Sequence, residues 1–153
     1  MISLDETDRK ILRRLQADAG LSVQAVADAV GLSLSPCWRR IKRLREEGAI
    51  AGQVTLVDQR AVGLTLTALA NVSLTDHHDE TVTAFERALA GWEEVLECHA
   101  VTGDRDYFLR ILAPDMEAYE RFLSQKLLKE PCVASVNSRF SLRRVKYTTA
   151  LPV

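Results

Sequence analysis

The sequence lacks the long apolar runs and the basic leader that mark membrane and exported proteins. Its longest apolar runs fall far below the roughly 18 residues of a membrane-spanning helix, and it does not begin with a basic segment followed by an apolar one. It has three cysteines, Cys37, Cys98 and Cys132, an odd number that favours reduced thiols over a disulfide framework. We therefore expect a cytoplasmic protein that does not span a membrane.

The chain also lacks a large excess of charge of either sign, with a formal net charge of −1 over 153 residues. Residues 1–60 contain ten Lys and Arg against eight Asp and Glu, whereas residues 61–153 contain ten against thirteen. The length suits one domain or two small ones. A near-neutral chain with a slightly basic first part predicts that the protein binds its partner through one face. Several copies of the chain would strengthen this binding.

Residues typical of catalysis and metal binding are few and lack the spacing that such sites need. Cys98 and His99 are neighbours on a predicted strand, so their side chains point to opposite faces and cannot easily share one metal ion. His77 and His78 lie in a predicted loop beside acidic residues, which favours a solvated turn over a metal site. No serine or cysteine is accompanied by a convincing base, so we expect neither an enzyme nor a bound metal or cofactor.

The stretch from Gly31 to Gly48 has the features of a capped, basic helix. Ser35 can cap the helix and Pro36 suits its first position, while Gly48 suits the residue just beyond its end. Helical spacing predicts an inward face made of Cys37, Ile41 and Leu44. The remaining surface carries five cations within seven positions: Arg39, Arg40, Lys42, Arg43 and Arg45.

Two further helices are predicted before this stretch. Apolar residues at helical spacing occur over 5–17, and Ser22 suits the N-cap of a short helix that ends at Gly31. Two short helices joined by a tight turn, the second of them basic, are typical of a helix-turn-helix. Residues 50–57 partly alternate in polarity, which predicts an extended strand or a small wing, and residues 58–64 resemble a linker.

The rest of the chain predicts the element order β-α-β-β-α-β. Alternating polarity indicates strands over 66–74, 95–102, 107–113 and 133–145, with a helix before Gly91 and another after Asp115. This order is that of a ferredoxin-like fold, in which both helices cover one face of a four-stranded sheet. A second copy of the sheet, in a symmetric dimer, would cover the other face.

The predicted fold class is therefore α+β. We expect a winged helix-turn-helix DNA-binding domain over residues 1–57 and a linker over 58–64. A ferredoxin-like domain for ligand binding and oligomerisation is expected over 65–153.

Four separate segments resemble, in the right order, the Lrp/AsnC or feast/famine family of transcription regulators. They are Leu4–Leu12 with Leu15 and Gln16, Gly31–Gly48, Val101–Tyr107, and Val145–Pro152. The resemblance covers nearly the whole chain and implies an N-terminal DNA-binding domain, an effector domain that binds amino acids, and dimers that often form rings of four. It predicts a sequence-specific regulator whose partners are double-stranded DNA and an amino acid or related small effector.

We expect the DNA-binding residues to lie at the start and along the exposed side of the basic helix. There, hydroxyl groups would meet phosphates and an arginine would read a guanine edge. In the alternative, the arginines form a solvated face paired with Glu46 and Glu47, and Trp38 belongs to the core. The predicted DNA-binding residues are Ser33, Ser35, Pro36, Trp38, Arg39, Arg40, Lys42 and Arg43.

The predicted hairpin turn over 103–106 suits an amino-acid effector. Its aspartates could bind the ammonium group and its exposed backbone N–H groups the carboxylate. The family resemblance adds residues of the last strand and Met116, whereas a plain turn with solvated aspartates is the alternative. The predicted effector-binding residues are Thr102, Gly103, Asp104, Asp106, Tyr107, Met116, Asn137, Ser138, Arg139 and Phe140.

Two residues leave alternatives open. Arg139 either selects a carboxylate-bearing ligand or forms a salt bridge between subunits. Cys37 lies in the first turn of a basic helix, where a lowered thiol pKa could make a redox switch, although its spacing also places it in the core. The alternatives to an amino-acid-responsive regulator are a redox- or metal-responsive regulator on the same scaffold and an amino-acid-binding regulatory subunit of a metabolic enzyme.

Overall fold

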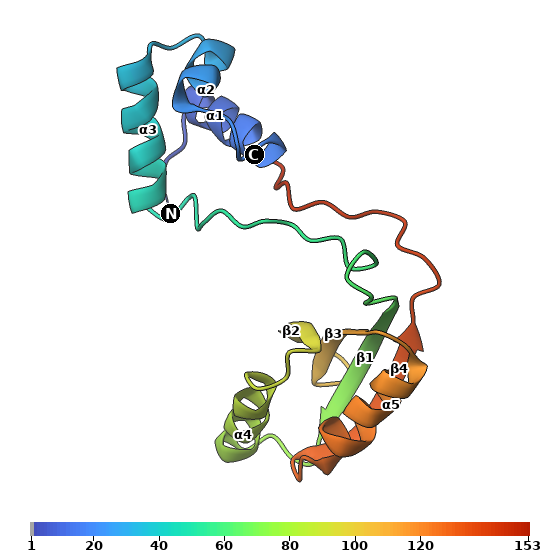
Figure 1. Cartoon of the computed structure of the whole chain (residues 1–153). Helices are drawn as coiled ribbons and strands as arrows, with labels where there is room; N and C mark the ends of the chain where they lie inside the picture. Colours follow the sequence, from blue (N-terminus) through green and yellow to red (C-terminus); the bar gives the residue numbers. More distant parts are fainter. Residues whose placement is uncertain (1) are drawn as a thin grey trace. The chain divides into compact units, whose positions relative to one another are not determined.

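The computed structural model describes residues 2–153, which divide into two compact units (Figure 1). The first unit comprises the described residues up to Leu56 together with the tail Val145–Val153, and the second comprises Val57–Arg144. The sequence-based boundaries assigned the tail to the C-terminal domain, whereas in the structure it packs with the N-terminal helices. The expected linker over 58–64 forms a turn of the second unit, in which the Asp58 carboxylate accepts from the backbone N–H groups of Arg60 and Ala61.

Three helices build the first unit: α1 (Glu6–Ala17), α2 (Val23–Val30) and α3 (Leu34–Glu46). Asp5 caps α1 through a reciprocal capping box with Asp8, and the Ser22 side chain caps α2 as predicted. The three amphipathic helices bury one apolar cluster: Ile11, Leu12, Val26, Ala27, Cys37, Ile41 and Leu44. The predicted helix-turn-helix is therefore confirmed.

The start of α3 differs from the prediction. The helix begins at Leu34 with Ser33 as its N-cap, so Ser35 is not the cap and Pro36 is the third helical residue. The first four N–H groups of a helix have no intrahelical partner, which is why proline is tolerated at this position too. Gly48, with a φ of 78°, follows the helix in the left-handed conformation as predicted.

Residues 50–57 were predicted to form a strand or wing, and in the described chain they form neither. Ile50 N donates to Leu44 O (3.0 Å) as the chain leaves α3, and the following residues run without a ladder partner (Figure 1). Alternating polarity favours an extended backbone, but a β-ladder also needs a neighbouring strand, and the described chain supplies none here.

The tail Val145–Val153 packs along α1. Gln16 pairs with the backbone of Leu151 in both directions: its Nε2 donates to Leu151 O (3.2 Å) and its Oε1 accepts from Leu151 N (2.6 Å). Arg13 Nε donates to Val153 O (2.6 Å), and Val153 packs against the apolar cluster of the helices. The last strand ends at Phe140, whereas the sequence predicted that it continues to residue 145.

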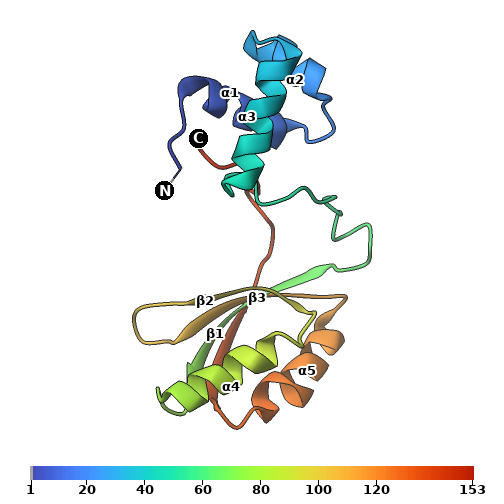
Figure 2. The ribbon, with the colours of Figure 1, turned by 90° about the vertical axis from the view of Figure 1, so that its left-hand side faces the viewer.

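The second unit is a four-stranded antiparallel sheet with both of its helices on one face (Figure 2). Its strand order is β2-β3-β1-β4, and the predicted β-α-β-β-α-β order is confirmed. Its elements are β1 (Leu66–Leu74), α4 (Asp79–Leu89), β2 (Val95–Ala100), β3 (Tyr107–Ala113), α5 (Met116–Gln125), the short 3-10 helix η1 (Leu127–Lys129) and β4 (Val133–Phe140).

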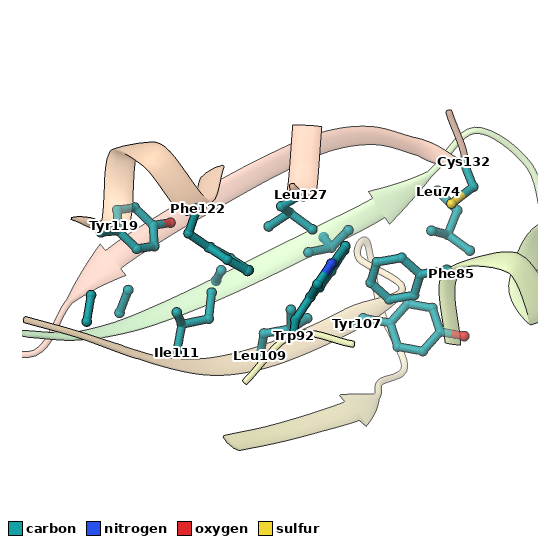
Figure 3. Packing of buried hydrophobic residues seen from close by; sticks show 14 residues of the cluster. Leu74, Phe85, Trp92, Tyr107, Leu109, Ile111, Tyr119, Phe122, Leu127 and Cys132 are labelled. Atoms are coloured by element: carbon teal, nitrogen blue, oxygen red, sulfur yellow. The ribbon is translucent and has the colours of Figure 1, made fainter. Parts of the chain in front are cut away.

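Side chains from one face of the sheet pack against α4 and α5 around a cluster of aromatic rings (Figure 3). The ring centroids of Phe85 and Tyr107 lie 4.7 Å apart, and Trp92 meets Phe122 edge to face at 5.6 Å. Because side chains alternate along a strand, the intervening residues lie on the opposite face, which neither helix of this unit covers. Along β1 this bare face carries Thr67, Leu69, Asn71 and Ser73.

Candidate functional site

The outward face of α3 is polar and basic. Cys37, Ile41 and Leu44 are buried, so Ser35, Arg39 and Lys42, which lie on the opposite side of the helix, are exposed. Trp38 is 51% exposed, and Lys42 Nζ lies 5.4 Å from the centre of its ring. Trp38 is therefore a surface residue and not part of the core.

Arg40 and Arg43 lie on the flank of α3 that faces α1, where both are ion-paired. Arg40 Nη1 donates to Asp5 Oδ2 (2.6 Å) and to Asp8 Oδ1 (2.8 Å), and Arg43 Nη2 donates to Asp8 Oδ2 (2.5 Å). The backbone N–H of Asp8 and the guanidinium of Arg40 lower the pKa of Asp5. Four of the five cations of α3 thus fall into two groups, the outward-facing Arg39 and Lys42 and the anchored Arg40 and Arg43.

In the alternative interpretation, the arginines of α3 pair with Glu46 and Glu47, and no such pair forms among the described residues. Glu46 pairs with Lys42, across 3.6 Å, one helical turn away. Arg40 and Arg43 instead find their partners at the start of α1, which spacing within α3 could not indicate. Ser33 and Pro36 lie at the start of α3, where Ser33 makes no side-chain capping bond.

A cavity of about 440 Å³ lies where the hairpin turn after β2 meets the bare face of the sheet. Four of the predicted effector residues line it together: Thr102, Asp104, Asn137 and Arg139. The remaining lining residues are Asn71, Val101, Arg105 and Phe108, which sequence reasoning missed. The alternation along β1 could have placed Asn71 on this face, but its pairing with Asn137 depends on the register of β1 with β4.

The other predicted residues of the last strand face the helices. The Ser138 hydroxyl is hydrogen-bonded to the Tyr119 hydroxyl of α5, and the rings of Phe140 and Tyr119 meet edge to face at 5.2 Å. Tyr107 likewise faces the core, and its hydroxyl donates to Glu86 Oε1 (3.3 Å). Successive residues on a strand point to opposite faces, so Asn137 and Ser138 cannot line the same side of the sheet.

Met116, which the family resemblance added to the effector site, begins α5 and is 51% exposed. The buried residues of α5 are Tyr119 and Phe122, and Met116 is not among the residues that pack against the core. Met116 does not line the cavity, so the structure does not bring it together with the other predicted effector residues.

Gly103, Arg105 and Asp106 build the hairpin turn. Asp106 Oδ2 accepts from Leu74 N (2.7 Å) and Oδ1 is hydrogen-bonded to His77 Nε2 (2.7 Å); these bonds lower the pKa of Asp106. Gly103 has a φ of 118°, a conformation that other residues rarely adopt. The carboxylate of Asp106 is therefore engaged by the end of β1 and by the loop before α4.

Asp104 is the carboxylate that this turn presents to solvent. Its side chain is 96% exposed, and the one ion pair described for it is a long contact of 3.9 Å with Arg105 Nε. Arg105 in turn donates from Nη1 to Ser73 Oγ (3.3 Å) and to Ser135 Oγ (3.0 Å), which ties the turn to β1 and β4. Asp104 is thus available to a ligand.

The thiols and imidazoles form no comparable site. Cys37 is fully buried, and burial raises its pKa, so the thiolate that a redox switch requires is disfavoured. Burial also raises the pKa of Cys98 to about 11. Among residues 2–153, no three His, Cys, Asp or Glu residues come together in a way that could hold a metal ion. None of the described helices is both long and apolar enough to cross a membrane.

A helix-turn-helix with an exposed basic helix, followed by a β-α-β-β-α-β unit with a polar cavity, defines a DNA-binding regulator with a ligand-binding domain. Comparison with protein families gives the same two parts. Residues 4–51 match the winged helix-turn-helix DNA-binding family, and residues 67–151 match the Lrp/AsnC ligand binding domain. The chain belongs to the Lrp/AsnC family of DNA-binding transcriptional regulators.

Individual relatives match the chain over nearly its whole length. The chain is 39% identical over 150 residues to the DNA-binding transcriptional activator DecR of Escherichia coli, covering 98% of this chain and 99% of DecR. It is 34% identical to the leucine-responsive regulatory protein of Escherichia coli, covering 98% and 92%. A transcriptional regulator of Neisseria meningitidis, solved as a complex with L-methionine, has a TM-score of 0.94 and 37% identity, covering 98% and 97%.

Proposed function

We propose that this regulator binds an amino acid in the cavity on the bare face of the sheet, and that the ligand alters its DNA binding or its oligomeric state. The observation that carries the proposal is the convergence of Asp104, Arg139 and Asn137 on one cavity of about 440 Å³. An exposed carboxylate can bind the ammonium group, and a guanidinium can bind the carboxylate. A cavity of this size suits a small molecule.

The family supports this choice of ligand class. One relative is described as leucine-responsive, and another was solved with L-methionine. The side chain of Arg139 makes no hydrogen bond or ion pair with any described residue, which suits a cation that meets a ligand or a second subunit. Its guanidinium favours a ligand that presents a carboxylate.

We further propose that the outward face of α3 contacts double-stranded DNA. Ser33 and Ser35 lie at the start of the helix, where hydroxyl and backbone N–H groups can meet a phosphate. Arg39 and Lys42 lie on the same exposed side, where an arginine can reach a guanine edge in the major groove. Trp38 borders this face.

A second copy of the chain is the proposed cover for the bare face of the sheet. Leu69 and Phe108 lie on this face among polar residues, and neither helix of the second unit shields them. A symmetric dimer would also present two copies of α3 to a two-fold DNA site. Assembly of such dimers into larger rings is the corresponding proposal for higher oligomers.

A thermal-shift screen of the twenty amino acids tests the effector site. A ligand that binds the native state raises the melting temperature, by about 4 °C or more when its concentration is about a hundredfold above Kd. Asp104→Ala should abolish the shift, whereas Glu120→Ala, which removes an exposed carboxylate from the outer side of α5, should retain it. An Asp104→Ala variant that responds like the parent would rule out this location.

A further inference from the structure

One carboxylate in the helical unit has a burial and a set of partners that the family assignment does not explain. The Asp8 side chain is 1% exposed, and Asp8 is the one buried charged residue among residues 2–153. A buried carboxylate is costly unless it is paired and hydrogen-bonded. Its partners should therefore reveal what it does.

Asp8 accepts three hydrogen bonds, from two different elements. One comes from the backbone N–H of Asp5 (3.1 Å) and completes the capping box of α1. The other two come from Arg40 (2.8 Å) and Arg43 (2.5 Å) on α3. A capping residue needs only the first of these bonds, so the two guanidiniums are held for another reason.

The two guanidiniums keep donors that Asp8 does not use. A guanidinium has five N–H groups, of which these ion pairs engage only one nitrogen of each arginine. The side chains of Arg40 and Arg43 remain 33% and 42% exposed. Arg43 Nε is buried without a hydrogen-bond partner among the described residues, so its guanidinium is held in place by Asp8 alone.

We propose that Asp8 is a positioning residue for DNA recognition, which fixes the guanidiniums of Arg40 and Arg43 along the flank of α3. An arginine on a free side chain loses rotamer freedom when it binds DNA, and an arginine that is already ordered loses less. The buried carboxylate orders both side chains before DNA arrives. The carboxylate also offsets part of the positive charge of the two arginines. This weakens their contacts with DNA phosphates more than it weakens contacts with bases, which require a defined geometry.

This inference rests on the proposed DNA-binding face of α3, and it predicts opposite effects on two kinds of DNA. Without the carboxylate, the arginines become mobile and more strongly cationic as a group. Affinity for the preferred sequence should then fall, while affinity for unrelated sequence is maintained or rises through phosphate contacts. A carboxylate that only stabilised the fold would change both affinities in the same direction.

The test is Asp8→Asn, measured by fluorescence anisotropy on two duplexes. One duplex is selected from a random pool by the parent protein, and the other is its scrambled counterpart. We expect the preference for the selected duplex to fall about tenfold, and the salt slope on the scrambled duplex to steepen by about 0.9, equivalent to one more phosphate contact. Glu6→Gln is the matched control, because it removes one negative charge from the same turn of α1. The Glu6 side chain pairs with Arg13 and not with a residue of α3.

A preference in Asp8→Asn equal to that in Glu6→Gln would overturn the proposal. If Asp8→Asn does not fold, Asp5→Asn decides instead, because asparagine is an equally good N-cap and Arg40 loses one of its two carboxylate partners. We then expect a fall in preference of roughly threefold, and no fall would count against the proposal. If Arg39→Ala binds the selected duplex like the parent, the DNA-binding face itself is wrong, which separates that failure from the failure of Asp8.

Discussion

At the scale of single residues, the cations of α3 differ in what they are free to do. Arg39 is exposed on the outward face, whereas Arg43 is tied to a buried carboxylate. Replacing Arg43 would therefore change stability as well as DNA binding, because Asp8 would keep fewer partners. Arg39 is the cleaner probe of contact with DNA.

We expect Arg39→Ala to weaken binding to the selected duplex about tenfold with little change in melting temperature, because the side chain is exposed and makes no ion pair with a described residue. Anisotropy titrations and a thermal melt measure the two quantities. Arg14→Ala removes an exposed arginine from the last turn of α1 and serves as the control for a general loss of charge. Equal effects of the two substitutions would remove Arg39 from the DNA-binding face.

At the scale of elements, one carboxylate joins three segments of the second unit. Asp106 precedes β3, accepts from the last residue of β1, and is hydrogen-bonded to His77 in the loop before α4. These bonds favour the ionised form, and they lower the pKa of Asp106. The stabilisation is therefore fully present above the unfolded-state pKa of about 3.9 and is lost as the pH falls through the lower folded-state pKa.

We expect the free energy of unfolding of the second unit to fall as the pH drops below about 4, and to fall less in Asp106→Asn. At pH 7, Asp106→Asn should cost about 1 kcal/mol, because a neutral amide accepts weaker hydrogen bonds. Urea unfolding can be followed by the fluorescence of the buried Trp92 in a Trp38→Phe background. Asp104→Asn, at the exposed position two residues earlier, should leave the acid dependence unchanged.

At the scale of the whole molecule, the bare face of the sheet is the feature that the second unit by itself does not explain. The bare face carries Leu69 and Phe108 together with the cavity proposed to bind the effector. A second copy on this face would place each cavity at or near an interface between subunits. Effector binding and oligomeric state would then be coupled, because a ligand that binds one arrangement better shifts the population toward it.

We expect Leu69→Asp to disrupt the proposed dimer, because an aspartate on the bare face of each sheet would be buried there without a partner. Light scattering at micromolar concentration should give roughly half the parent mass. Thr83→Asp, on the exposed side of α4, adds the same charge away from the bare face and should keep the parent mass. A Leu69→Asp variant with the mass of the parent would contradict the proposed interface.

Much of the local structure followed from the sequence because its causes are local. The spacing of Cys37, Ile41 and Leu44 predicted the inward face of α3, and alternation predicted β1 and β3 with the bounds that the structure shows. The prediction was less accurate where two signals competed. Pro36 indicated a helix start that lies earlier in the structure, and the alternation over 50–57 indicated a strand for which the chain has no partner.

The sequence by itself determined the class of the protein, its element order and the basic character of α3, because composition, periodicity and turn residues act over a few neighbouring positions. Only the tertiary structure decided which residues meet across long separations. The register of β1 with β4 placed Asn137 and Arg139 at the cavity and turned Ser138 away from it. The packing of α1 on α3 brought the buried Asp8 to Arg40 and Arg43, more than thirty positions away, and no local pattern encodes that pairing.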